Sequence, residues 1–566
     1  MAHPRRLSAA GDIMTIDYQT LKFDYRPRAA GADEGEPHPA VVVGAGPVGL
    51  AAAIDLAQQG VPVVLLDDDD TLSAGSRAIC FAKRTLEIFD RLGCGERVAQ
   101  KGVSWHVGKV FLQDELIYAF DLLPEVGHAR PAFVNLQQYY VEGYLAERAL
   151  ELPNLDLRWK SRVTGIRQTP EHAELDVDTP EGPYTLRARY VIAADGSKSP
   201  LRAMMGLDSR GRTFKDRFLI ADVKVKAPFP AERWFWFDPP FHRNQSVLLH
   251  RQPDDVWRID FQLGWDADPV AEKAPERVIA RVRALLGPNV EFELEWVSVY
   301  TFRCQRMDSF RHGRVLCAGD SAHGVSPFGA RGANSGVQDA DNLAWKLKLV
   351  LDGRAPDRLL DTYAREREFA ADENIRNSTR STDFITPKSP ISRVFRDATL
   401  KLARDCEFAR RLVNSGRLSV PAVLAVSPLN TPDRAGETFE RAPAPGAVAL
   451  DAPVLANGAP GWLLPHLTGG FVGILFGSID DAGALVDATR GHALPIAPVL
   501  VVPKGDARAV AGVDVIEDSE GLAAQRYDAR PGTFYLLRPD QHVCARFRTA
   551  DANAVRAALA RAICNA

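Results

Sequence analysis

The stretch 40-AVVVGAGPVGLAAAIDLAQQGVPVVLLD-67 decides the fold of this chain. Its β-branched run at 41–43 predicts a short buried strand, and apolar residues then recur at helical spacing from 50 to 57. A second apolar run at 63–66 predicts another strand. Strand, helix and strand in this order are typical of a βαβ unit in a parallel sheet.

Three glycines join the first predicted strand to the helix in the pattern GxGxxG. Gly44 permits a tight turn, Gly46 lets the backbone approach a pyrophosphate, and Gly49 allows the helix to pack closely on the strand. Asp67 follows about twenty residues later, where a carboxylate accepts hydrogen bonds from ribose hydroxyls. The sequence therefore predicts a dinucleotide-binding unit with its phosphates at the helix N-terminus.

Two further apolar runs end in acidic motifs. Residues 190–194 lead into an Asp-Gly pair at 195–196, and residues 314–318 lead into a Gly-Asp pair at 319–320. Carboxylates at the carboxyl ends of buried parallel strands lie where α/β sheets bind ligands. We expect both pairs and the glycine turn to meet at one edge of one sheet.

A glycine-rich loop at 326–336 follows the third predicted strand, and a helix is predicted from residue 337 to about 351. Asn334 or Ser335 would cap this helix, with its backbone N–H groups and positive dipole end directed into the loop. Such an arrangement stabilises a delocalised anion.

Alternating apolar and polar residues at 103–121 and 214–302 predict the strands of a second sheet. The aromatic run 234–237 belongs to it, and a sheet with one apolar face would roof a pocket. Residues 442–446 are typical of a linker, and 446–566 alternate between strand and helix patterns.

Composition excludes several classes of function. A net charge of −4 over 566 residues gives no general attraction to nucleic acid or an anionic membrane, so we expect a small-molecule partner. The seven cysteines form no CxxC pair and no metal-ligand spacing, which indicates reduced thiols and no metal centre. No apolar run reaches the roughly 20 residues of a membrane span, and we expect a cytoplasmic protein.

Together these motifs resemble the FAD-dependent aromatic hydroxylases, the class A flavoprotein monooxygenases of the para-hydroxybenzoate and phenol hydroxylase type, in the branch of 3-(3-hydroxyphenyl)propionate hydroxylase. The resemblance covers nearly the whole chain from Ala40. It implies that the three glycines bind the ADP part of FAD and that Asp67 binds its ribose. It also implies that the DGxxSxxR motif serves both FAD and the nicotinamide cofactor, through Asp195, Gly196, Ser199 and Arg202. Gly319 and Asp320 match the GD motif, whose carboxylate is implied to bind the flavin ribityl chain.

The same resemblance assigns residues around the flavin ring. Gln138 is similar to a cofactor-facing glutamine, and Arg77 to an arginine that commonly lies beside the flavin. The loop that cradles the ring is implied to contain Pro327, Gly332, Ala333 and Asn334. Many family members read GQGMN at this loop, whereas this chain has the sequence ARGAN at 330–334.

The implied fold class is α/β, with a Rossmann-type FAD-binding domain interleaved with a β-rich substrate domain and followed by a C-terminal thioredoxin-like domain. The C-terminal domain has an implied structural or dimer-forming role, so a homodimer is expected. The expected boundaries are an N-terminal arm at 1–39, FAD-binding parts at 40–102, 131–213 and 304–380, substrate-domain parts at 103–130 and 214–303, a helical region and linker at 381–445, and the C-terminal domain at 446–566.

The implied reaction is reduction of FAD by NADH or NADPH, capture of O2 as a flavin C4a-hydroperoxide, and hydroxylation of a phenolic or amino-substituted aromatic ring. A phenol reacts better as phenolate, so a base is needed. Phenol hydroxylases place an aspartate in the region that matches 78–82, where this chain has no acidic residue. His106 and His250 are the candidate catalytic residues of the predicted roofing sheet.

Three alternatives stay open at this point. Residues 234–239 approximate the WxWxIP motif of flavin-dependent halogenases, although Asp238 stands at the isoleucine position. A flavin-dependent oxidase or dehydrogenase would share the fold without oxygen transfer. A non-catalytic flavin-binding scaffold would retain flavin without substrate-stimulated oxidation of NADH or NADPH. Neither the aromatic substrate nor the preferred nicotinamide cofactor follows from the sequence.

Overall fold

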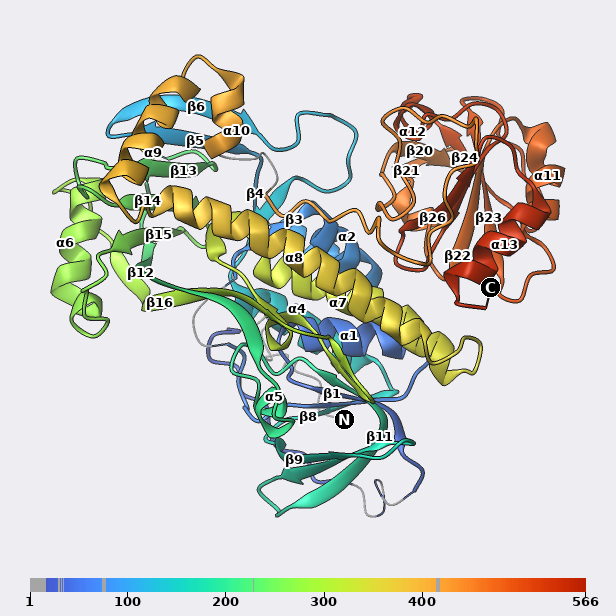
Figure 1. Cartoon of the computed structure of the whole chain (residues 1–566), viewed down its shortest axis with the longest axis horizontal. Coiled ribbons are helices and arrows are strands. Elements are labelled where there is room, and N and C mark those ends of the chain that lie inside the picture. Colours follow the sequence, from blue (N-terminus) through green and yellow to red (C-terminus); the bar gives the residue numbers. More distant parts are fainter. Residues whose placement is uncertain are drawn as a thin grey trace, which may run out of the picture.

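The computed structural model describes residues 17–28, 31, 33, 35–73, 78–227, 229–413 and 418–565. Figure 1 shows a nucleotide-binding sheet with its helices, a second sheet at the upper left, and a C-terminal lobe at the right. Of the helices in the described ranges, none is long and apolar enough to cross a membrane.

The predicted βαβ unit is confirmed as β1 (His38–Val43), α1 (Pro47–Gln58) and β2 (Val63–Leu66). Strand β1 lies in the middle of its sheet and pairs in parallel with β2 on one side and with β11 (Tyr184–Ala193) on the other. The remaining strands of this sheet are β8 (Leu155–Arg158), β9 (Arg162–Gln168), β10 (Ala173–Asp178), β17 (Arg311–His312) and β18 (Val315–Cys317).

The apolar pattern at 155–163 contains two strands, β8 and β9, because the chain turns at Lys160, whose φ of 54° is left-handed. Strand β8 pairs in parallel with β2, whereas β9 and β10 form an antiparallel hairpin on β11. Strand pairing depends on distant partners, which local sequence does not contain.

Helices cover this sheet and connect it to the rest of the molecule. Helix α7 (Gly332–Leu351) packs on α1, and the long helix α8 (Leu359–Ile385) runs from the nucleotide-binding sheet to the second sheet in Figure 1. The other helices outside the second sheet and the C-terminal domain are α2 (Lys83–Leu92), α3 (Gly95–Lys101), α4 (Gln138–Glu151), α5 (Pro200–Met204), α9 (Pro390–Ala403) and α10 (Glu407–Val413).

The second sheet, which we call the roof sheet, has the strand order β19-β16-β12-β15-β14-β13-β5-β6. Its parallel pair β13–β5 joins the two β-rich sequence ranges. Its strands are β5 (Val107–Leu112), β6 (Glu115–Asp121), β12 (Ser209–Lys224), β13 (Arg233–Phe237), β14 (Ser246–Arg251), β15 (Val256–Leu263), β16 (Glu293–Met307) and β19 (His323–Gly324).

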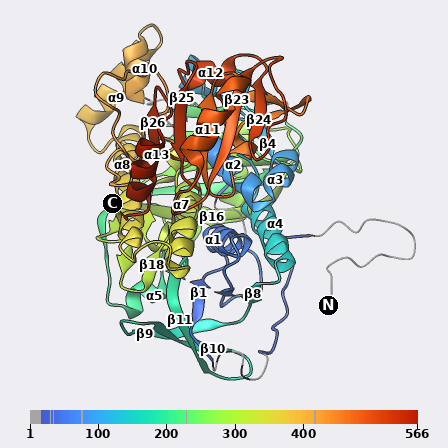
Figure 2. The ribbon, with the colours of Figure 1, turned by 90° about the vertical axis from the view of Figure 1, so that its right-hand side faces the viewer.

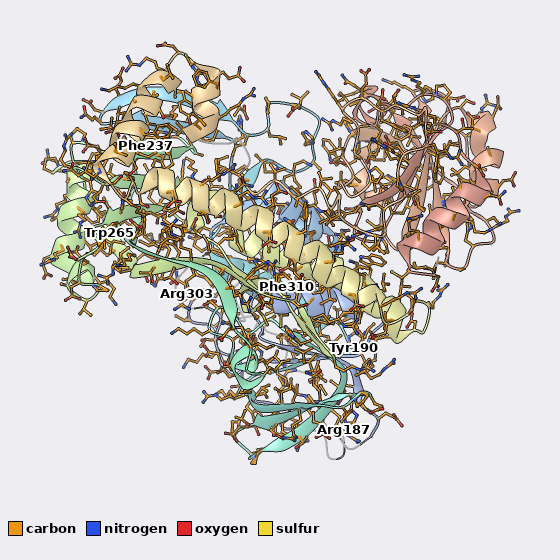
Figure 3. The ribbon with its side chains drawn as sticks, in the orientation of Figure 1. Arg187, Tyr190, Phe237, Trp265, Arg303 and Phe310 are labelled. Carbon is orange, nitrogen blue, oxygen red and sulfur yellow. The ribbon has the colours of Figure 1, made fainter. Side chains whose placement is uncertain are left out.

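The aromatic run in β13 is divided between the two faces of the roof sheet, because successive side chains of a strand alternate. Trp234 and Trp236 pack on the outer face, which helix α6 (Pro275–Leu286) covers. Phe235 and Phe237, the latter labelled in Figure 3, lie on the inner face, which α8 contacts. The two tryptophans of the halogenase-like motif therefore point away from the inner face.

A small sheet of β3 (Cys80–Ala82), β7 (Phe133–Asn135) and β4 (Val103–Trp105) lies between the two large sheets. The described part of the N-terminal segment packs on the nucleotide-binding unit. There Phe23 stacks on Trp159 at 4.2 Å between ring centroids, and Tyr18 is buried. The described part of the expected arm is thus packed on the nucleotide-binding unit, because these aromatic side chains bury apolar surface.

The C-terminal domain has a mixed sheet in which β22, β23 and β24 are parallel and β25 and β26 form an antiparallel hairpin. Figure 2 shows this domain above the nucleotide-binding sheet. Its elements are β20 (Pro453–Ala456), β21 (Ala459–Trp462), β22 (Phe471–Phe476), α11 (Ala482–Thr489), β23 (Ile496–Pro503), β24 (Asp514–Asp518), α12 (Leu522–Arg526), β25 (Thr533–Leu537), β26 (Val543–Phe547) and α13 (Ala552–Ala562).

Buried ion pairs join this domain to the nucleotide-binding unit. The guanidinium of Arg538 donates to Glu366 of α8 at 2.7 Å, and Lys346 of α7 bonds the same carboxylate at 2.7 Å. All three side chains are fully buried. In the other direction, Arg84 of α2 donates to the backbone oxygen of Asp540 at 2.8 Å.

Candidate flavin site

Three strand ends meet at one edge of the nucleotide-binding sheet, as the sequence predicted. Val43 of β1 lies opposite Ala193 of β11, which lies opposite Cys317 of β18. The glycine turn, the Asp-Gly pair and the Gly-Asp pair leave the sheet next to one another. Segments more than a hundred residues apart thereby form one site.

The glycine turn has the shape that a pyrophosphate needs. Gly44 has a φ of 104°, and a Cβ there would lie 2.4 Å from the backbone oxygen of Ala194. A Cβ at Gly49 would lie 1.8 Å from the oxygen of Gly44, so only glycine permits this packing. Gly46 faces open space and is the N-cap residue of α1, where no side chain caps the helix. The first-turn N–H groups of α1 are thus available to phosphate oxygens.

Asp67 directly follows β2 and is tied to the glycine turn. Its Oδ2 accepts a hydrogen bond from Ala45 N at 2.5 Å, and its Oδ1 accepts one from Asp69 N at 2.9 Å. Burial raises its pKa to about 6, against the lowering effect of these backbone bonds. The carboxylate is held at the edge where a ribose would lie.

The Asp195 segment is bonded to the third strand end. The carboxylate of Asp195 accepts hydrogen bonds from Ser199 Oγ at 2.6 Å and from Ser321 Oγ at 2.8 Å. Arg202 donates to the backbone oxygens of Ser321 at 2.8 Å and Ser197 at 2.7 Å. Asp195 and Arg202 therefore fix the two motifs to each other.

Gly319 begins the turn η2 (Gly319–Ser321), with a φ of 61° and its Cα against α1. Asp320 is the exposed residue of this turn. The N–H of Gly319 donates to Asp339 of α7 at 2.9 Å. That fully buried carboxylate also bonds His323 at 2.7 Å and Arg367 at 2.6 Å. These three residues support the turn and escaped the sequence analysis.

The loop before α7 contains η3 (Pro327–Gly329) and Ala330, whose φ is 50°. Helix α7 starts at Gly332 and not at 337, with Arg331 as its N-cap. The prediction that Asn334 or Ser335 caps the helix is wrong, because both lie in its first turn. The Asn334 side chain instead donates to Cys80 O and accepts from Ala82 N, each at 2.8 Å.

We call the turn 44–49, the turn 319–321 and the loop 327–334 the cradle. Gly332 and Ala333 form the first turn of α7 within it, and a Cβ at Gly332 would have 3.9 Å to its nearest neighbour. Gln138 accepts a hydrogen bond from Ala78 N at 2.9 Å and donates to Ser73 at 3.1 Å. It holds both ends of the segment that contains Arg77, which lies outside the described residues.

The two predicted catalytic histidines lie in different environments. His250 of β14 is buried on the inner face of the roof sheet, with its Nδ1 3.9 Å from the Sγ of Cys80. Burial and two neighbouring guanidinium groups lower its pKa well below the usual value. His106 lies between β4 and β5 with a side chain that is 56% exposed and bonded to Asp121. His106 therefore lies on the surface, apart from the cradle.

Comparison with known proteins agrees with this geometry. Residues 38–378 match the family model described as an FAD-binding domain. The 3-(3-hydroxy-phenyl)propionate/3-hydroxycinnamic acid hydroxylase of Mycobacterium sp. (strain JLS) is 28% identical over 88% of this chain and 88% of its own. The probable NADH-specific resorcinol 4-hydroxylase of Rhodococcus jostii (strain RHA1) is 32% identical over 68% of this chain and 71% of its own.

Solved structures share the fold. The flavin-dependent monooxygenase PieE, in complex with FAD and substrate, superposes with a TM-score of 0.77 at 24% identity and covers 94% of this chain and 100% of that one. The p-nitrophenol 4-monooxygenase PnpA of Pseudomonas putida DLL-E4 gives a TM-score of 0.61 at 27% identity, over 68% of this chain and 99% of that one.

The chain belongs to this FAD-binding family of flavoproteins. Within it, the chain is an FAD-dependent aromatic hydroxylase of the class that its sequence motifs resemble.

Proposed function

We propose that this enzyme uses NADH or NADPH and O2 to hydroxylate a phenolic or amino-substituted aromatic ring, with FAD held in the cradle. The convergence of three strand ends on one sheet edge carries this proposal. Bound FAD supplies the transfer of electrons from the nicotinamide and the activation of oxygen. The protein must bind the flavin, orient the ring and exclude water.

Individual residues have the following roles in this proposal. Gly44, Gly46 and Gly49 admit the pyrophosphate, and Asp67 accepts hydrogen bonds from the ribose. The first turn of α7 would direct its backbone N–H groups and its positive dipole end at a flavin ring held in the cradle, where they would stabilise negative charge. The further residues proposed to contact the flavin or shape its site are Arg77, Gln138, Asp195, Gly196, Arg202, Gly319, Asp320, Pro327, Gly332, Ala333 and Asn334.

The inner face of the roof sheet covers the ring of the substrate. His250 faces this region from β14 and stays neutral, so it acts as a hydrogen-bonding group and not as a cation. Phe235 and Phe237 add apolar surface on the same face. The name of the Rhodococcus relative supports NADH as the first nicotinamide to test.

The remaining expectations belong to the same proposal. Residues 40–102, 131–213 and 304–380 form the FAD-binding domain, and 103–130 with 214–303 form the substrate domain. Residues 446–566 form a thioredoxin-like domain that serves homodimer formation in the cytoplasm. The parallel β22, β23 and β24 beside an antiparallel hairpin support this fold assignment.

The test is oxidation of NADH and NADPH by flavin-loaded enzyme across phenols, anilines and hydroxybenzoates, with hydrogen peroxide measured in parallel. We expect one ring class to accelerate oxidation with hydroxylated product in near-stoichiometric amount. Acceleration that yields only peroxide would indicate an oxidase and contradict the proposal. Sedimentation of the full chain, expected as a dimer, tests the oligomeric state.

A further inference from the structure

Exposed apolar side chains are concentrated on the helix pair α9 and α10. Fifteen large apolar residues are exposed in the described ranges, and six of them lie on these two helices, which have 14 and 7 residues. The six are Ile391, Val394, Phe395, Leu402, Phe408 and Leu412. Ile391 is 81% exposed and Phe395 is 60% exposed, so most of each side chain is in contact with water. A cluster of this kind on the surface of a protein indicates a binding partner.

The apolar residues of α9 form a stripe that the fold does not use. Four exposed apolar residues recur at positions i, i+4, i+7 and i+11 and therefore lie on one face of the helix. They are Ile391, Phe395, Ala398 and Leu402. A different face of α9 is buried, where Leu400 and Ala403 belong to the same core as Phe237 of the roof sheet. Since that face holds α9 in place, the stripe is available to a partner.

Helix α10 packs back on α9 and adds to this surface. Arg410 of α10 donates to the backbone oxygens of Ala403 at 2.8 Å and Arg404 at 2.6 Å. Phe408 and Leu412 are exposed and lie one helical turn apart on α10. Figure 1 and Figure 2 both show the helix pair at the outer edge of the molecule. A surface at this edge reaches an extended partner before the rest of the molecule contacts it.

The helix pair is basic, although the chain as a whole is acidic. Residues 390–413 contain six arginine or lysine residues and three aspartate or glutamate residues, a net charge of +3, whereas the whole chain has −4. Three of the basic residues are exposed and directly precede an exposed apolar residue in the sequence. They are Arg393, Lys401 and Arg411. An apolar helix face beside basic side chains is typical of helices that lie in the interface of an anionic bilayer.

A second copy of this chain fits the same surface less well. In a twofold-symmetric dimer such a patch meets itself, so its positive charges would face one another. Like charges placed across an interface are unfavourable. An anionic phospholipid surface offers the opposite charge to the basic side chains and an acyl layer to the apolar ones. Charge complementarity therefore favours the bilayer.

We propose that α9 and α10 dock this protein on an anionic phospholipid bilayer. The apolar side chains enter the boundary between headgroups and acyl chains, and the basic side chains lie at the lipid phosphates. The proposal is independent of the reaction proposed above, because no part of it involves flavin or substrate. Since α9 packs on the roof sheet, docking also places that sheet close to the bilayer.

Co-sedimentation of the flavin-loaded full chain with vesicles is the first test. Vesicles that contain phosphatidylglycerol in phosphatidylcholine are compared with vesicles of phosphatidylcholine alone. We expect binding to the anionic vesicles to be about tenfold tighter or more, and to weaken as salt is raised from about 0.05 M to about 0.5 M, because salt screens the lipid charge. Hydrogen exchange of the wild-type protein should slow at 391–402 and 407–412 when anionic vesicles are added, which needs no variant.

Two pairs of substitutions separate the apolar and charged contributions. Ile391→Ser with Phe395→Ser should weaken binding to anionic vesicles at least tenfold, because two large side chains no longer leave water. Val270→Ser is the matched control, since Val270 is 76% exposed just before the turn η1 (Ala271–Lys273), which packs on α6. Lys401→Gln with Arg411→Gln should also weaken binding about tenfold.

The control for the charge change is Arg162→Gln with Arg210→Gln, which removes two exposed arginines from β9 and β12. Flavin content and melting temperature equal to those of wild type establish that each variant is folded. Unchanged vesicle binding after Ile391→Ser with Phe395→Ser would overturn the proposal, as would equally tight binding of wild type to phosphatidylcholine alone.

Sedimentation without lipid distinguishes the other possible occupant of this surface. If a second copy covers it, wild type binds no vesicles and forms a dimer that Ile391→Ser with Phe395→Ser converts to a monomer, and the proposal is overturned. If the proposal is right, this double substitution leaves the oligomeric state unchanged and reduces only the binding to vesicles.

Discussion

Replacing Asp339 by asparagine tests how the cradle is supported. This carboxylate lies on α7 and is fully buried, and it bonds Gly319 N, His323 and Arg367. Asparagine keeps the volume but leaves the Arg367 guanidinium buried without its counter-charge. Loss of one partner of a buried ion pair is destabilising by about 3–5 kcal/mol. The turn at Gly319 also loses its fixed acceptor, so FAD should bind more weakly by about tenfold or more.

Calorimetry and flavin titration measure the two effects. At about 2 °C per kcal/mol for a large domain, the melting temperature should fall by about 6 °C or more. Burial alone would raise the pKa of Asp339, but His323 and Arg367 hold it below its usual value. Its stabilising effect is therefore present above the unfolded-state pKa and is lost as pH falls through the folded-state pKa. Asp352→Asn, on the exposed end of α7, is the control. An Asp339→Asn protein that melts within 1 °C of wild type with unchanged FAD affinity would refute the reasoning.

Three more predictions follow from other contacts. Gly49→Ala should yield protein without FAD, because the added Cβ would lie 1.8 Å from the oxygen of Gly44. Gly483→Ala is the control and should retain FAD, because Gly483 faces open space. The ratio of flavin absorbance to protein absorbance distinguishes the two variants. The pKa of Asp67 is raised from 3.8 to about 6, so the apoprotein should lose stability as pH rises between these values. Ribose hydroxyls that donate to the carboxylate should lower this pKa, so FAD binding should release protons near pH 6. Calorimetric titration in buffers of different ionisation enthalpy measures this release, and its absence would count against the ribose contact. Arg538→Met removes one of the positive charges that neutralise the buried carboxylate of Glu366, so the melting temperature should fall by several degrees. Arg530→Met, at an exposed position, is the control and should leave the melting temperature unchanged. Equal melting temperatures of the two variants would show that the interface ion pairs contribute little to stability.

The parts of the site that depend on local sequence were predictable. The turn from β1 into α1 needs glycine for steric reasons, and an apolar run that ends in an acid marks a strand end facing ligand. These signals located Gly44, Asp195 and Gly319 at one edge before any pairing was known. The alternating pattern also placed His250 on a strand of the second sheet, where the structure has β14.

Other features depend on pairings that sequence does not contain. Asp339 bonds residues 16 and 28 positions away on different elements, and no motif joins them. Cys80 of β3 and His250 of β14 lie 170 residues apart, so only the folded structure shows their contact. The start of α7 was misplaced because its N-cap is Arg331, a residue type that seldom marks a helix start.

The central claim, that the cradle serves ring hydroxylation, is tested most directly by product analysis under 18O2. Flavin-loaded enzyme, NADH and an accepted phenolic or amino-substituted aromatic ring are incubated, and the product is analysed by mass spectrometry. We predict one 18O atom in a new ring hydroxyl for each NADH consumed. Product without label, or NADH oxidation that yields only hydrogen peroxide with every ring tested, would contradict this account.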